Sequence, residues 1–186
     1  MAGLFLLTIF SYLVGAIPTG YIVGKVGYGI NLQAKGSGNT GTANTRRVLG
    51  IFPALLVLAG DLGKALFVLE VTRRLGYPES VEWWMGVCAV IGHIYPIYLK
   101  FKGGKGLATA AGLFVGKEPV TLVIFLLLWY LVYLLTKNGA FSSVLAMTGV
   151  TLYLLILGIL SGIIGCLVII LRHTPEAWTF LAQQRE

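Results

Sequence analysis

Two glycine-rich polar stretches hold most of the residues whose types and spacing could do chemistry. The first, residues 36–47, reads Gly-Ser-Gly-Asn-Thr-Gly-Thr-Ala-Asn-Thr-Arg-Arg, and the second, residues 100–106, reads Lys-Phe-Lys-Gly-Gly-Lys-Gly. Glycine lets backbone N–H groups approach a ligand closely, and lysine or arginine supplies positive charge. We call these stretches the first and second glycine loops and expect them to bind phosphate-bearing molecules.

The first glycine loop adds hydroxyl, amide and guanidinium donors to its backbone N–H groups. Its Gly-x-Gly-x-x-Gly spacing formally matches a dinucleotide fingerprint, but that fingerprint requires a preceding strand, and an apolar segment precedes it here. A polar surface turn is the alternative interpretation. The residues expected to contact a ligand are Ser37, Gly38, Asn39, Thr42, Asn44 and Arg47.

The second glycine loop lacks the spacer and the Lys-Ser/Thr ending of a Walker loop. Its lysines and glycines, at the start of a helical segment, still make an anion site, to which a helix N-terminus adds partial positive charge. A cationic anchor touching lipid headgroups would explain the lysines but not the glycines. The expected ligand contacts are Lys102, Gly103, Gly104, Lys105 and Gly106.

Ionisable residues also occur inside apolar segments. Asp61 and Lys64 have an i, i+3 spacing that allows them to pair on one helix face. Lys64 is therefore either half of a neutralised structural pair or a cation facing the substrate. His93 and His173 have no Asp or Glu partner nearby in the sequence. His93 is either a hydrogen-bonded core residue or part of the site. His173 either interacts with the C-terminal end of the last helix or is part of the site. No metal or organic cofactor is expected.

The composition indicates which elements must position these residues. Of 186 residues, 57% are hydrophobic and 11% are charged, and the mean hydropathy is +0.87. A soluble domain carries about 25% charged residues, so lipid is the expected solvent. The net charge of +7 does not by itself imply nucleic acid. We predict an all-α integral membrane protein forming a single domain over residues 1–186.

About seven transmembrane helices are expected, some of them short or half-spanning. The boundary between the last two is weak, because mainly glycine and serine separate them. The apolar segments are residues 3–25, 51–72, 81–99, 106–116, 119–136, 140–157 and 160–172.

The basic residues predict the orientation of these segments. With the N-terminus outside and the C-terminus cytoplasmic, ten of the 14 lysines and arginines are cytoplasmic and three are external, while Lys64 lies within a segment. The positive-inside rule favours this topology. It places both glycine loops and Arg172-His173 on the cytoplasmic face. The ten are Lys25, Lys35, Arg46, Arg47, Lys100, Lys102, Lys105, Lys137, Arg172 and Arg185, and the three are Arg73, Arg74 and Lys117.

The motifs together resemble a known family. Gly-Ser-Gly-Asn-x-Gly…Asn…Arg-x-Leu-Gly at 36–50, Asp-x-x-Lys at 61–64 and Gly-His-x-x-Pro…Phe-Lys-Gly-Gly-Lys-Gly-x-Ala-Thr at 92–109 are similar to the bacterial acyl-phosphate-dependent glycerol-3-phosphate acyltransferases (PlsY type). The resemblance extends over nearly the whole chain. It departs from the family at Glu176, where asparagine is usual, and in lacking the later Gly-Thr-Glu, although Glu186 lies nearby.

The resemblance implies transfer of a fatty acyl group from acyl phosphate to the 1-hydroxyl of sn-glycerol 3-phosphate, giving lysophosphatidic acid and phosphate. It implies that Ser37, Arg47 and His173 are catalytic and that residues 102–106 bind phosphate. Lys64 and His93 are added as substrate-binding candidates. The expected setting is the bacterial cytoplasmic (inner) membrane, with the active site on the cytoplasmic face of a monomer surrounded by lipid.

Two other classes of function compete with this interpretation. A transporter of phosphorylated solutes would carry charges along a path across the membrane, whereas the basic residues here gather on one face. A protein that only binds anionic lipid headgroups would need lysines but not the asparagines, serine and histidines. For the enzyme, direct attack by the glycerol hydroxyl is favoured over an acyl-Ser37 intermediate. His93, His173 or a substrate phosphate oxygen remain the candidate proton acceptors.

Overall fold

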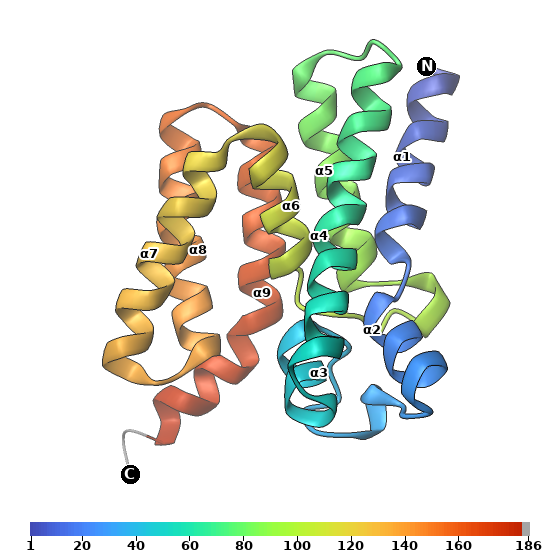
Figure 1. Ribbon diagram of the computed structural model, residues 1–186. Coiled ribbons are helices and arrows are strands. Elements are labelled where there is room, and N and C mark those ends of the chain that lie inside the picture. Colours follow the sequence, from blue (N-terminus) through green and yellow to red (C-terminus); the bar gives the residue numbers. More distant parts are fainter. Residues whose placement is uncertain (184–186) are drawn as a thin grey trace. The chain divides into compact units, whose positions relative to one another are not determined.

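The computed structural model describes residues 1–183, and every regular element within that range is a helix (Figure 1). Within these described residues, five helical stretches are long and apolar enough to cross a membrane. The chain divides into two compact units, an N-terminal unit, Met1–Leu113, and a C-terminal unit that begins at Phe114.

The N-terminal unit is built on three long helices, α1 (Ala2–Ala16), α4 (Ile51–Arg74) and α5 (Glu79–Ile94). Helix α1 packs against α5, with α4 in contact with both. Gly92 allows this close approach, because a Cβ there would collide with the backbone of α1. Leu7, Val68, Met85 and Ala89 form a buried cluster between the three helices.

The first apolar segment is broken in the middle. Helix α1 ends at Ala16, and the chain continues after Pro18 as α2 (Thr19–Tyr21) and a π-helix, η1 (Ile22–Gly27). Proline has no N–H to donate to the preceding turn, which accounts for the break at this position. The break leaves the carbonyl of Ile17 outside the regular hydrogen bonding of α1, where it accepts from the N–H of Thr19 at 3.0 Å and from Nζ of Lys64 at 3.3 Å.

Short elements connect these helices at one end of the N-terminal unit. They are η2 (Leu32–Ala34), α3 (Thr42–Leu49) and η3 (Ile97–Leu99). Helix α6 (Leu107–Lys117) follows, and it is too short to cross a bilayer because 11 residues rise only about 16 Å.

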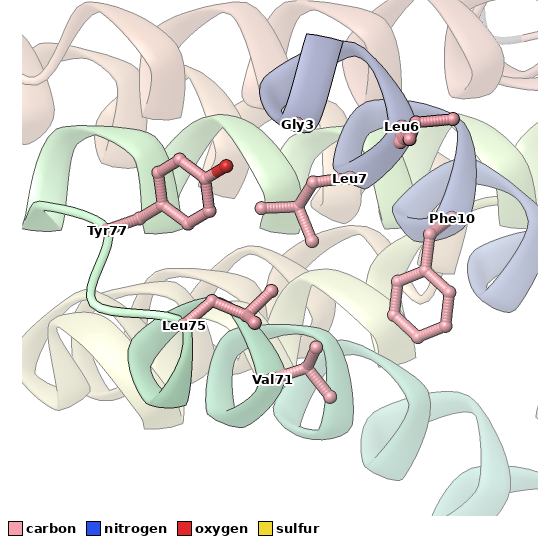
Figure 2. Close-up of a pocket in the computed structure, with 7 residues that line it drawn as sticks. All are labelled: Gly3, Leu6, Leu7, Phe10, Val71, Leu75 and Tyr77. Atoms are coloured by element: carbon pink, nitrogen blue, oxygen red, sulfur yellow. The ribbon is translucent and has the colours of Figure 1, made fainter.

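The opposite end of the N-terminal unit holds an apolar hollow of about 430 Å³ (Figure 2). Beside it, Arg73 pairs with Glu82, which joins the ends of α4 and α5, while Arg74 pairs with Glu70 on α4 itself. The two ends of this unit therefore differ in chemistry. The hollow is lined by Gly3, Leu6, Leu7, Phe10, Val71, Leu75 and Tyr77.

The C-terminal unit contains α7 (Pro119–Thr136), α8 (Gly139–Ile156) and α9 (Leu160–Gln183). Helix α8 packs against both neighbours. The indole of Trp129 donates to the hydroxyl of Ser143 at 3.1 Å, and Asn138 caps α8 by accepting from the N–H of Phe141. Gly158 adopts a φ of 70° in the turn that separates α8 from α9.

Each of the seven predicted apolar segments corresponds to a helical stretch, which confirms the predicted all-α membrane architecture. Three boundaries differ. The third helix ends at Ile94 rather than near 99, because Tyr95-Pro96 stops it. The last helix continues past Pro175 to Gln183, and the second half of the first glycine loop is helix α3. Arg185 and Glu186 lie outside the described residues.

Candidate active site

The buried side chain of Asn44 holds the first glycine loop in its shape. Its Nδ2 donates to the carbonyl oxygens of Asn39 at 2.8 Å, Lys35 at 3.0 Å and Leu32 at 3.2 Å. Its Oδ1 accepts from the backbone N–H of Ser37 at 2.8 Å. Since an amide nitrogen carries only two hydrogens, the loop itself saturates this donor. Asn44 therefore positions the loop, and its contact with a substrate stays a prediction.

The turn that carries Ser37 depends on glycine. Gly36 has a φ of 59°, in the left-handed region, and a Cβ at this residue would collide with Oδ1 of Asn44. Further along, Oδ1 of Asn39 accepts from the N–H of Gly41 at 2.7 Å, just before helix α3 begins. Ser37 is exposed on this turn, where its hydroxyl can reach a ligand.

Helix α3 carries the remaining predicted residues of the first glycine loop. Arg46 and Arg47 are both exposed on it. Thr42 opens the helix, and its buried hydroxyl has no hydrogen-bond partner within residues 1–183. The predicted contacts of Thr42 and Arg47 with a substrate remain untested by the geometry.

The second glycine loop begins with two residues in an uncommon backbone conformation. After Pro96 ends α5 and η3 adds one turn, Lys100 and Phe101 have φ values of 52° and 62°. Non-glycine residues in this region cost on the order of 1 kcal/mol each and persist where the surrounding structure fixes them. The chain therefore turns sharply at the point where its lysines begin.

The glycines of this loop fold back onto the end of α5. The N–H of Gly103 donates to the carbonyl of Ile94 at 3.2 Å, and the N–H of Gly104 donates to that of His93 at 3.1 Å. These bonds satisfy carbonyls that the end of a helix leaves without partners. Gly106, with a φ of 90°, then accepts from Ala110 as α6 begins, which confirms the predicted position of the loop at a helix start.

A side chain next to the first glycine loop bonds to the second. Nε2 of Gln33, which lies just before the first loop, donates to the carbonyl oxygen of Lys102 in the second at 2.9 Å. Between them lies a hollow of about 490 Å³. Gly38 and Lys102 were predicted as ligand contacts, whereas the other lining residues were not. The lining consists of Tyr21, Asn31, Gln33, Gly38, Tyr98, Leu99, Lys100 and Lys102.

Beneath the loops, the predicted pair of Asp61 and Lys64 is confirmed and gains a third member. Nζ of Lys64 lies 3.0 Å from Oδ1 of Asp61 and 2.7 Å from Nδ1 of His93. The same nitrogen donates to the carbonyl of Ile17, at the break in the first segment, at 3.3 Å. All three side chains are at least 93% buried. We call Asp61, Lys64 and His93 the buried trio.

His173 belongs to the C-terminal unit. It is buried on α9, and its Nδ1 lies 2.9 Å from the carbonyl oxygen of Ile169, one turn earlier. Because α9 continues past His173 to Gln183, the alternative prediction that His173 acts at a helix C-terminus is wrong. A catalytic role for His173 beside the glycine loops stays a prediction.

Comparison with known proteins adds independent information. A family model described as "Glycerol-3-phosphate acyltransferase" matches residues 5–183. The chain is 41% identical over 177 residues to the glycerol-3-phosphate acyltransferase of Macrococcus caseolyticus, covering 92% of this chain and 90% of that protein. It is also 41% identical over 150 residues to the enzyme of the same name from Pseudomonas aeruginosa, covering 81% and 79%.

Two crystal structures share the fold. Both are of PlsY (YgiH), an integral membrane glycerol 3-phosphate acyltransferase, and each similarity covers 99% of this chain and 94% of the other. The glycerol 3-phosphate form has a TM-score of 0.84 at 31% identity. The lysophosphatidic acid form has a TM-score of 0.85 at 32% identity.

Proposed function

The chain belongs to the glycerol-3-phosphate acyltransferase family of the PlsY type, and we propose that it uses acyl phosphate as the acyl donor and the 1-hydroxyl of sn-glycerol 3-phosphate as the acceptor. The family accounts for acylation of glycerol 3-phosphate to lysophosphatidic acid. The observation that carries the finer proposal is the hydrogen bond between Gln33, just before the first cationic glycine loop, and Lys102 in the second. Two such loops suit a reaction in which both substrates carry a phosphate.

The first glycine loop is proposed to hold the acyl-phosphate head, with Ser37 exposed toward it. The backbone N–H groups and side-chain donors there would stabilise the developing oxyanion and the leaving phosphate. The second loop, through Lys102 and Lys105, would hold the phosphate of glycerol 3-phosphate, with Arg47 and His173 contributing. The remaining loop contacts predicted from the sequence, Gly38, Asn39, Thr42, Gly103, Gly104 and Gly106, belong to the same proposal.

Acyl phosphate is already activated, so the protein mainly has to orient the reactants and stabilise charge. In the proposed step the glycerol 1-hydroxyl oxygen attacks the carbonyl carbon. The bond between that carbon and the phosphate oxygen breaks, and inorganic phosphate leaves. The hydroxyl proton passes to a histidine or to a substrate phosphate oxygen. No acyl group is attached to Ser37 in this route.

The setting of the reaction is also proposed. Large apolar side chains are exposed on the long helices, for example Phe52, Leu135 and Ile156, as lipid contact requires. The acyl chain would enter from lipid and glycerol 3-phosphate from water. A monomer in the bacterial inner membrane, with both glycine loops on the cytoplasmic face, allows the two substrates to meet.

A direct assay tests this function. The protein, purified in detergent, is given acyl phosphate with and without glycerol 3-phosphate, and released phosphate and acylated product are measured. We expect phosphate release to depend on glycerol 3-phosphate and to match lysophosphatidic acid formation. Acyl-coenzyme A, offered in parallel, should give no product.

Other results would point to other functions. Product from acyl-coenzyme A but not from acyl phosphate would overturn the proposed donor. Movement of glycerol 3-phosphate across vesicles without acylation would identify a transporter. Binding of anionic lipid with neither activity would identify a headgroup-binding protein.

A further inference from the structure

The contacts of Lys64 define how hydrogen bonds run through the buried trio. An ammonium has three N–H donors, and three acceptors surround Nζ: Oδ1 of Asp61, Nδ1 of His93 and the carbonyl of Ile17. When Lys64 is charged, its three N–H donors are therefore matched by three acceptors, whereas Oδ2 of Asp61 has no hydrogen-bond partner within residues 1–183. Asp61 supplies the opposite charge, so the group is neutral as a whole, which is the state that burial favours.

With Lys64 charged, this pattern assigns the proton of His93 to one ring nitrogen. Nδ1 then accepts from Lys64 at 2.7 Å, and a neutral ring carries its hydrogen on Nε2. Nδ1 also lies 3.4 Å from Oδ1 of Asp61, to which it donates only in the other tautomer. A second hydrogen on Nδ1 would place an imidazolium against the ammonium. His93 therefore has no free lone pair while Lys64 is charged.

The other edge of the ring meets the second glycine loop. A Cβ at Gly104 would collide with Nε2 of His93, so the backbone of the loop lies directly on this edge. The loop is also bonded to the end of α5 through the carbonyl of His93. Through Lys64, the same ring is tied to the carbonyl of Ile17 at the break in the first segment. The trio thus connects α4, the chain break and the loop.

We propose that Asp61, Lys64 and His93 are positioning residues that fix the second glycine loop, and that His93 is not the proton acceptor in acyl transfer. This inference rests on the proposed function. It removes one of the three proton acceptors that the sequence left open. In this proposal Lys64 supports the second glycine loop and does not bind the substrate.

His93→Asn tests the protonation part of the proposal. The asparagine oxygen can take the place of Nδ1 and accept from Lys64, but asparagine cannot accept a proton as a base. We expect kcat within about tenfold of wild type, with an unchanged pH profile of kcat, and a KM for glycerol 3-phosphate raised about tenfold or more. If His93 were the general base, the variant would instead lower kcat by about 10²-fold or more, and the pH profile of kcat would lose one of its limbs.

Lys64→Met alone and together with Asp61→Asn tests the positioning part. The single variant leaves a buried carboxylate without its cation, so its unfolding temperature in detergent should fall. The double variant restores neutrality and should recover the unfolding temperature, but it should keep a raised KM because His93 has lost its donor. Recovery of both the unfolding temperature and the KM would mean that Asp61 and Lys64 only neutralise each other. The positioning role would then be overturned.

Glycine variants provide a readout that leaves the three residues of the trio unmutated. Gly104→Ala should raise KM for glycerol 3-phosphate, because the added methyl displaces the ring of His93. Gly63→Ala is the matched control: it lies beside Lys64 on α4, and its Cβ would meet no atom within 4 Å. Equal KM values for the two variants would contradict the proposal. A wild-type protein without activity would instead refute the proposed function itself.

Discussion

At the scale of the residue, the site depends on polar side chains whose hydrogen-bond donors are all taken up by surrounding protein groups. Asn44 makes four hydrogen bonds to the backbone of residues 32–39, and Lys64 has three acceptors for its three hydrogens. Removing one such partner leaves several buried groups unsatisfied, at about 1–3 kcal/mol each. Ser37 differs, because its exposed side chain is available to a ligand.

Replacement of Asn44 by alanine should therefore damage both stability and activity. We expect the free energy of unfolding to fall by about 2–4 kcal/mol and acylation to fall by about 10²-fold or more, since the turn that carries Ser37 is released. Thermal unfolding in detergent and the phosphate-release assay measure the two effects. Asn138→Ala is the control, because it removes the single cap bond of α8 and should lower stability by about 1 kcal/mol without changing KM.

Ser37→Ala separates direct attack from a covalent route. Because the side chain is exposed on its turn, the variant should fold normally and lose activity through weaker binding or charge stabilisation. Wild-type protein incubated with radiolabelled acyl phosphate, without glycerol 3-phosphate, should retain no label after denaturation. Label on the wild type that is absent from Ser37→Ala would establish an acyl-serine and exclude direct attack.

At the scale of the element, the glycine loops are shaped by helix ends. The first loop turns into α3, while the second completes the last turn of α5 and then begins α6. Because a helix end leaves backbone groups without partners, a loop that bonds to them acquires one defined shape. The loops are thus held by long helices while their glycine backbone remains open to ligands.

Gly36→Ala should be far more harmful than Gly29→Ala. Both glycines have a positive φ, 59° and 67°, so both variants carry backbone strain on the order of 1 kcal/mol. Only at Gly36 does the added Cβ meet another group, Oδ1 of Asn44, whereas at Gly29 it meets no atom within 4 Å. We expect Gly36→Ala to reduce acylation at least tenfold more than Gly29→Ala. If the two variants were expressed equally and had similar activities, the position of the Asn44 side chain would not matter for acylation.

At the scale of the whole molecule, the chemistry depends on orientation in the membrane. At one end of the N-terminal unit, Gln33, just before the first glycine loop, bonds to Lys102 in the second. Arg73 and Arg74 lie at the other end of α4, beside the apolar hollow in Figure 2. If α4 crosses the bilayer, the loops and these arginines must face opposite aqueous compartments.

Labelling of single cysteines measures this orientation. In a background with Cys88 and Cys166 replaced by alanine, we expect Ser37→Cys and Lys102→Cys to react with an impermeant maleimide from the same side of sealed vesicles. Arg74→Cys, whose site is 79% exposed, should react only from the opposite side. Reaction of Ser37→Cys and Lys102→Cys from different sides would eliminate the proposed meeting place of the two phosphates.

The sequence alone determined the helical membrane architecture, the two glycine loops and the pairing of Asp61 with Lys64. These features are local, since they depend on hydrophobic runs, glycine content and spacing along one helix. The resemblance of the motifs to a family supplied the reaction. Boundaries were less accurate where helices begin or end within polar sequence, as at α3 and beyond Pro175.

Only the tertiary structure decided how the site is held together. Lys64 and His93 are 29 residues apart, and Gln33 and Lys102 are 69 apart, so no local pattern predicts that they meet. The pairing arises because α4 packs against α5 and because the first segment breaks at Pro18, which turns a backbone carbonyl toward Lys64. A buried charge takes whichever partners packing brings to it, and packing is a property of the folded chain.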